Sequence, residues 1–252
     1  MVEIRNLSAG YPGKAVLENL CLEIPEGLLT VIAGPNGCGK STLLKALAGI
    51  LPSGGEICLA GESLAGLPPQ QRSRRIAYLP QTRTVPEITA GRFVLHGRFP
   101  YLSYPQRYRA EDYRVAHSAM EQMKIAHLAD RQLPTLSGGE RQKVYIAMVL
   151  AQETQVVLMD EPTSYLDISH KFEVIRMAGE LKGAGKTVIM VLHDLELALR
   201  YADRLVLMEA GKVREYAPPA EIVRSGTLEA VFGVHVGQTE TDEGPQYYFL
   251  PE

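Results

Sequence analysis

The sequence predicts an α/β fold with parallel strands, a β-rich beginning and a mainly helical insert. The first observation is a continuous apolar run, 28–33, which ends in a glycine-rich loop that opens a helix. Such a run is typical of a strand buried on both faces of a sheet. The second is the alternation of helical and strand-like stretches from Leu136 onward, which indicates helical crossovers between parallel strands. The third is residues 83–134, where no strand-like run occurs.

Composition restricts the class of protein. The 252 residues, 46% hydrophobic and 22% charged, suit one large domain or a core domain with an insert. A net charge of −3 without a basic run argues against nucleic acid as a partner. No apolar run approaches the ~20 residues of a membrane-spanning helix, and residues 1–6 show no signal-peptide pattern. We therefore expect a cytoplasmic protein that reaches a membrane only through a partner.

The three cysteines, Cys21, Cys38 and Cys58, show neither a CxxC pair nor metal-ligand spacing. We interpret them as free thiols in a reducing compartment.

The N-terminal elements follow from periodicity. Residues 2–7 and 16–24 alternate between apolar and polar side chains and predict strands, and 28–33 predicts a buried strand. From Ser41 the period changes, and apolar residues recur at helical spacing until Gly49 and Pro52 end the helix.

The later elements are predicted in the same way. The insert contains a helix over 111–123. Further helices are expected over 137–151, 169–182 and 195–201, and strands over 76–79, 155–159, 186–192 and 204–208. Residues 218–252 predict two short helices and an irregular tail.

A phosphate-binding loop lies between the strand 28–33 and the helix that follows it, and fits GxxxxGK[ST]. Glycines let backbone N–H groups close around phosphate oxygens, and the helix N-terminus favours the same anion. Lys40 is expected to reach the β- and γ-phosphates of ATP, and Ser41 to bind Mg²⁺. The alternative is a turn that only joins strand to helix. The predicted nucleotide-binding residues are Gly34, Pro35, Asn36, Gly37, Cys38, Gly39, Lys40, Ser41 and Thr42.

Two acidic residues, Asp160 and Glu161, stand at the end of a predicted buried strand. Ligands collect at the carboxyl ends of strands in such sheets, so Asp160 is expected to hold the Mg²⁺ hydration shell. Glu161 would then orient and deprotonate the attacking water. The alternative is that both acids cap the next helix. His193 follows another strand in the same way and is expected to hydrogen-bond a γ-phosphate. The other histidines show no metal spacing.

The segment Leu136–Gln142, Leu-Ser-Gly-Gly-Glu-Arg-Gln, resembles the signature of ABC-type ATPases. It is itself an anion site at a helix N-terminus. The resemblance implies a head-to-tail dimer, in which Ser137, Gly138 and Gly139 close over the ATP held by the partner's phosphate-binding loop.

Other positions match the same family. The resemblance implies that Tyr11 stacks on adenine, although a strand-end core tyrosine is the alternative. It implies that Gln81 contacts Mg²⁺ or water, and that Asp167 belongs to a loop at the dimer interface. Tyr165 departs from the small residue commonest in that loop. The resemblance covers roughly residues 1–232.

The family fold implied is a P-loop NTPase with a mixed sheet and an N-terminal antiparallel β subdomain. Within a single domain, 1–82 and 135–215 would form the core. Residues 83–134 would form the helical subdomain, continuing into the helix 137–151, and 216–252 a small extension.

Three stretches, 97–101, 148–152 and 164–170, are similar to ATPase subunits of iron–siderophore, haem and vitamin B12 importers. This implies two membrane-spanning permease subunits, an indirect extracytoplasmic substrate-binding protein, and a place on the inner face of the membrane. The cargo implied is an iron chelate such as a ferric siderophore or ferric citrate, or a related haem or cobalamin compound. The alternatives are a soluble ABC-type ATPase acting on nucleic acid or ribosomes, and a small-molecule kinase.

A last expectation concerns Cys38, which lies within the phosphate-binding loop at a helix N-terminus. That setting lowers thiol pKa values. The sequence therefore predicts a lowered pKa for Cys38 and alkylation that ATP prevents.

Overall fold

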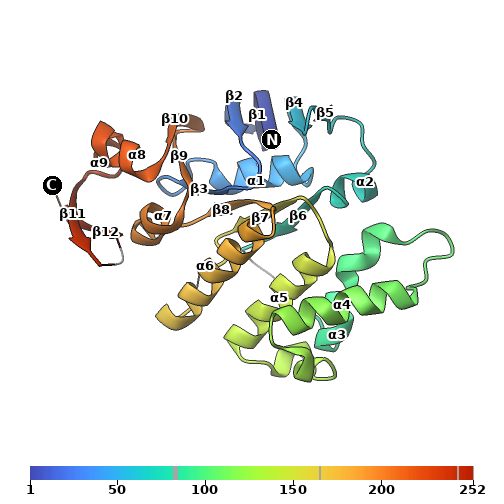
Figure 1. Ribbon diagram of the computed structural model, residues 1–252. Coiled ribbons are helices and arrows are strands. Elements are labelled where there is room, and N and C mark those ends of the chain that lie inside the picture. The colour runs from blue at the N-terminus through green and yellow to red at the C-terminus, as the bar shows by residue number, and fades with distance from the viewer. Residues whose placement is uncertain (82–84, 165, 243, 252) are drawn as a thin grey trace.

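The computed structural model describes residues 1–81, 85–164, 166–242 and 244–251 (Figure 1). The α-helices of these residues are α1 (Lys40–Ala48), α2 (Pro69–Ser73), α3 (Ala90–Leu95), α4 (Ala110–Gln122), α5 (Gly138–Ala151), α6 (Ile168–Gly183), α7 (Leu195–Tyr201), α8 (Pro219–Ser225) and α9 (Thr227–Phe232), with short 3₁₀ helices η1 (His96–Tyr101), η2 (Ala126–Leu128) and η3 (Leu133–Thr135). The strands are β1 (Val2–Tyr11), β2 (Lys14–Ile24), β3 (Leu29–Ala33), β4 (Ser53–Leu59), β5 (Glu62–Ser63), β6 (Ile76–Leu79), β7 (Val156–Asp160), β8 (Thr187–Val191), β9 (Arg204–Glu209), β10 (Lys212–Ala217), β11 (Val234–Thr241) and β12 (Gly244–Pro251).

A six-stranded mixed sheet forms the centre, in the order β10-β9-β3-β8-β7-β6. Strands β9 to β6 are parallel, and β10 pairs antiparallel with β9 at one edge. Every residue of β3, β7 and β8 is buried, as expected for strands covered on both faces. Because the parallel strands point the same way, the loops after β3, β6, β7 and β8 meet at one edge.

A second sheet, β2-β1-β4-β5, is antiparallel and lies next to α1 (Figure 1). Ile4, Leu7 and Leu17 of this sheet pack with Leu43 and Leu44 of α1 in one core cluster, which one face of the central sheet completes. The predicted fold class, an α/β core with an antiparallel N-terminal part, is confirmed.

The described part of the insert carries α3, η1, α4, η2 and η3, which lie together with α5 at one end of the molecule (Figure 1). The Arg98 side chain, 6% exposed, joins these elements. Its guanidinium donates to Asp112 Oδ1 (3.2 Å), to the Ala151 carbonyl oxygen (2.8 Å) and to Glu153 Oε2 (2.6 Å). It also lies over the Tyr101 ring, 4.1 Å from the centroid. One buried cation thus links η1, α4 and the end of α5.

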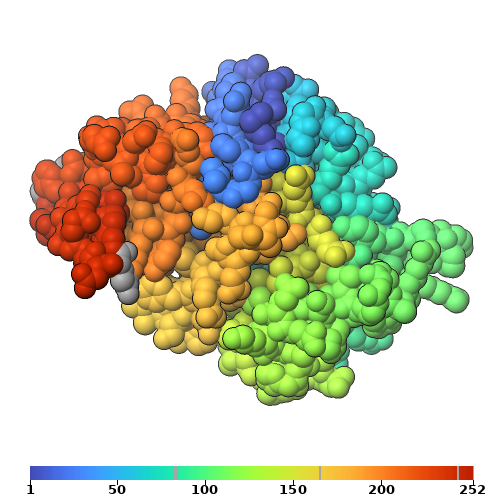
Figure 2. Space-filling model, viewed as in Figure 1, coloured from blue at the N-terminus to red at the C-terminus, as the bar shows by residue number. Residues whose placement is uncertain are grey.

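The C-terminal stretch corrects a prediction. Helices α8 and α9 are present, but the expected irregular tail is wrong, because β11 and β12 form a regular antiparallel hairpin. Most residues of both strands are exposed or half-buried, and Tyr247 is the buried residue of β12. The alternation of apolar and polar residues that predicts a strand is therefore weak in this part of the sequence. Strand β12 packs against α7, a contact that the sequence pattern does not indicate. Figure 2 shows this extension and the helical insert at opposite ends of the visible face.

In the described part of the chain, no helix combines the length and the apolar character that crossing a bilayer requires.

Candidate nucleotide-binding site

The phosphate-binding loop joins β3 to α1 and is held by its own lysine. The Lys40 ammonium is buried and donates to the carbonyl oxygens of Gly34 (2.7 Å) and Pro35 (2.9 Å). Gly39 caps α1 with φ +106° and has no side chain to occupy the first N–H groups of the helix. Gly37 also has a positive φ, +77°. The loop therefore turns where glycine allows it and leaves helix N–H donors for an anion.

A hydroxyl and a carboxylate meet beside the loop. Ser41 Oγ donates to Asp160 Oδ1 at 2.8 Å, and the Tyr78 hydroxyl donates to Asp160 Oδ2 at 3.1 Å. Asp160 ends β7 and is 1% exposed. Burial raises the pKa of its carboxyl, while the two hydrogen bonds act in the opposite direction. The sequence predicted the pair Ser41 and Asp160, and the structure brings them into contact.

Glu161 lies at the centre of a second cluster. Its Oε2 accepts from Gln81 Nε2 and from Ser164 Oγ, the latter at 3.0 Å, and its Oε1 pairs with His193 Nε2. Its backbone has φ +47°, an uncommon conformation for a non-glycine residue, found often at functional sites. The residues that follow β6, β7 and β8 therefore converge on one carboxylate. The expected contact of His193 with a phosphate stays a prediction.

Glu161 and His193 line a pocket of about 270 Å³ together with residues of the phosphate-binding loop. Tyr11 lines the same pocket. The Tyr11 side chain is exposed, with Lys45 Nζ 3.5 Å from its hydroxyl oxygen, so its ring is available to a nucleobase. The loop residues that line the pocket are Asn36, Gly37, Gly39, Lys40, Ser41 and Thr42.

The signature residues lie elsewhere. Ser137, Gly138 and Gly139 are all described, and none of them lines the pocket. Ser137 Oγ accepts from the Glu140 N–H (3.3 Å) and Glu140 Oε2 accepts from the Ser137 N–H (2.8 Å), which forms a capping box at the start of α5. The backbone hydrogen bond from Ser137 lowers the pKa of the Glu140 carboxyl. Asp167 caps α6 in a similar way and is likewise outside the pocket.

Cys38 requires a correction. Its thiol is buried, and burial raises the pKa of the Cys38 thiol although the nearby Lys40 charge acts to lower it. The prediction of a lowered pKa is wrong, because burial of the side chain outweighs the Lys40 charge and the backbone N–H groups of Lys40 and Cys38, which act to lower the pKa. A protonated thiol is a poor nucleophile; alkylation that ATP prevents stays a prediction.

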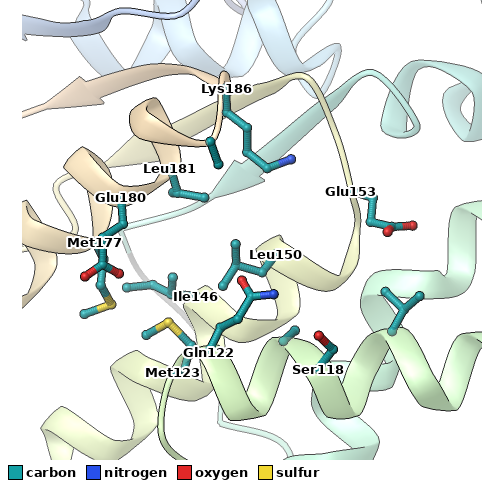
Figure 3. Close-up of a pocket in the computed structure, with 13 residues that line it drawn as sticks. Ser118, Gln122, Met123, Ile146, Leu150, Glu153, Met177, Glu180, Leu181 and Lys186 are labelled. Atoms are coloured by element: carbon teal, nitrogen blue, oxygen red, sulfur yellow. The ribbon is translucent and has the colours of Figure 1, made fainter.

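A second cavity, of about 340 Å³, lies between α4, α5 and α6 (Figure 3). Apolar side chains such as Met123, Ile146 and Met177 line it together with Lys186 and Glu180. The residues lining it include none of the predicted site residues, so we assign the nucleotide to the pocket beside the phosphate-binding loop.

Comparison with known proteins shows the family of this chain. The ABC transporter family model matches residues 17–164, which is more than half of the chain. The chain therefore belongs to the ABC transporter family, and it is an ATP-binding ATPase of that family.

Two relatives and one solved structure show which members of the family the chain is similar to. The chain is 44% identical over 231 residues to the ferric enterobactin transport ATP-binding protein FepC of Escherichia coli (strain K12), covering 90% of this chain and 85% of that protein. It is 39% identical over 242 residues to the probable siderophore transport system ATP-binding protein YusV of Bacillus subtilis (strain 168), covering 95% and 88%. It also resembles a solved inward-facing, putative metal-chelate type ABC transporter, with a TM-score of 0.86, 28% identity and coverage of 100% and 97%.

The structure adds residues that the sequence reading missed. Tyr78 and Ser164 each donate a hydrogen bond to one of the two acids. Both lie within three positions of a predicted residue, Gln81 or Glu161, and that proximity was the available signal. Tyr165, the predicted departure from the family pattern, lies outside the described residues.

Proposed function

We propose that this chain is the ATP-binding and ATP-hydrolysing subunit of an importer for an iron chelate. Two copies would pair head to tail and drive two membrane-spanning permease subunits from the cytoplasmic face of the membrane. An extracytoplasmic substrate-binding protein would deliver the cargo. The observation that supports the pairing is that Ser137, Gly138 and Gly139 do not line the pocket, although the signature turn and the phosphate-binding loop would each bind an anion at a helix N-terminus.

The residues beside the pocket fit MgATP. A hydroxyl oxygen from Ser41 and a carboxylate oxygen from Asp160 are the hard ligands that Mg²⁺ prefers, with water and phosphate completing its shell. When bound, Mg²⁺ neutralises charge that develops on the phosphates. Lys40 and the N–H groups of α1 would hold the phosphate oxygens, and Tyr11 the base. Glu161 would accept a proton from the attacking water while Gln81, Ser164 and His193 orient its carboxylate.

The pairing is tested with two variants. They distinguish the binding of ATP by a single chain from the formation of the ATP-induced dimer. Ser137→Asp keeps a good helix cap but places a negative charge where a partner's phosphate would dock. We expect unchanged binding of ATP to the isolated subunit, loss of ATP-induced dimers and at least a hundredfold lower ATPase rate. Lys40→Met should instead weaken ATP binding itself. Equal loss of binding in both variants, measured with a fluorescent ATP analogue, would place the signature turn in the same chain's site.

The cargo class is tested in the complex reconstituted with its permease subunits. Of the relatives named above, one is a ferric enterobactin transport ATP-binding protein and the other a probable siderophore transport system ATP-binding protein. We expect a ferric siderophore bound to its receptor to raise the ATPase rate several-fold, and haem or cobalamin to leave it unchanged. Stimulation by haem or cobalamin alone would contradict the siderophore class while leaving the ATPase assignment intact.

A further inference from the structure

His170 lies between the signature turn and the Asp167 loop, the two segments that would face a second copy in the proposed dimer. It lies in the first turn of α6, and its backbone N–H (2.9 Å) and its Nδ1 (2.7 Å) both bond to Asp167 Oδ1. An ionised carboxylate only accepts hydrogen bonds, so Nδ1 carries a proton. These two bonds lower the pKa of the Asp167 carboxyl. The opposite edge of the ring, at Nε2, is thereby turned away from Asp167.

That opposite edge lies against the signature turn. A Cβ built at Gly139 would come within 2.1 Å of His170 Nε2 and 2.2 Å of its Cδ2. Gly139 has no positive φ, and a helix position accepts alanine more readily than glycine. The backbone therefore does not require glycine at 139. The imidazole ring occupies the space that a side chain at 139 would need.

The neighbouring glycine shows the contrast. A Cβ at Gly138 would meet nothing within 4 Å, and Gly138 also lacks a positive φ. Two adjacent glycines of one motif thus have different surroundings: open space at 138 and a histidine ring at 139. Further along the same two helices, Lys143 Nζ of α5 pairs with Glu173 Oε2 of α6 at 3.1 Å, so the helices are joined at more than one level.

We propose that His170 is a positioning residue that fastens the signature turn to the Asp167 loop, with its ring seated in the space that a side chain at Gly139 would fill. The two segments then move as one body when a second copy docks. The packing is a property of the single chain. Its consequence for catalysis rests on the proposed function, because only the dimer brings the signature turn to a nucleotide.

The packing is tested by thermal unfolding of the isolated subunit. Gly139→Ala should lower the unfolding temperature by about 3–10 °C, because overpacking must displace the ring. Gly138→Ala, the matched control, should change it by less than about 2 °C. In a His170→Ala background the same Gly139→Ala change should leave the temperature unchanged or raise it, since the ring is gone and alanine favours the helix. An equal drop in both backgrounds would overturn the proposal.

The positioning role is tested by kinetics. His170→Ala should leave the affinity of the isolated subunit for a fluorescent ATP analogue within about twofold, lower kcat about tenfold and weaken ATP-induced dimers. His170→Asn, whose amide can still donate to Asp167 but which lacks the ring edge that lies against Gly139, should restore little of kcat. A wild-type kcat in His170→Ala, or an equal loss of ATP affinity, would contradict the role. If the wild-type chain does not dimerise with ATP, the proposed function fails, while the unfolding comparison still decides the packing.

Discussion

Glu161→Gln is expected to lower the ATPase rate by about 10²–10⁴-fold, the range that removal of a general base produces. The amide keeps the size of the side chain, and its oxygen can still accept from Gln81 and Ser164, as the carboxylate does. It cannot accept a proton at neutral pH. ATP affinity should therefore stay within about threefold of the wild-type value, and the protein should accumulate as an ATP-bound dimer, visible by analytical ultracentrifugation.

The control for this prediction is Glu62→Gln. That carboxylate is 67% exposed, pairs with Arg75 at 2.5 Å and lies outside the nucleotide pocket, so its neutralisation should leave the rate unchanged. A wild-type rate in Glu161→Gln would assign water activation to another group.

Arg98→Met is expected to lower the free energy of unfolding by about 3–5 kcal/mol, because it leaves Asp112 as a buried carboxylate without its cation. Asp112 has a side chain that is 9% exposed, and it accepts one further bond, from the Arg109 N–H at 2.8 Å. The methionine keeps much of the apolar length of arginine, so lost packing contributes little. Chemical denaturation followed by circular dichroism measures the change.

An exposed ion pair provides the comparison. Arg214 Nε lies 3.2 Å from Glu209 Oε2, with side chains 57% and 39% exposed. Surface pairs of this kind contribute about 0–1 kcal/mol, so Arg214→Met should change the unfolding free energy by no more than that. A loss below about 1 kcal/mol for Arg98→Met would mean that water reaches Asp112 once the arginine is removed.

Much of the site could be predicted because it follows strand ends. The loop after β3, the acids after β7 and the histidine after β8 are local patterns, and parallel topology then places them at one edge. The bonds among them could not be predicted in this way. Whether Ser41 meets Asp160, or Gln81 meets Glu161, depends on register between strands that are far apart in sequence.

The failures have physical causes too. The pKa of the Cys38 thiol was predicted from its position at a helix N-terminus. The pKa depends more on burial of the thiol in the core, which the neighbouring residues of the sequence do not indicate. The β11–β12 hairpin has too few buried side chains for a visible period. The His170 ring contacts Gly139 in the space that a side chain would fill, and this contact joins two segments of the chain. A glycine in a known motif does not indicate which side chain packs against it.

The position of the signature turn outside the pocket has a genetic consequence for the proposed pair. In that pair each pocket would draw on two polypeptides, so a defective polypeptide would also spoil the pocket of an intact one. In a cell that makes both forms and pairs them at random, fully intact assemblies decline as the square of the intact fraction. A loss-of-function allele at Ser137 would therefore be partly dominant, although its own loop still holds ATP.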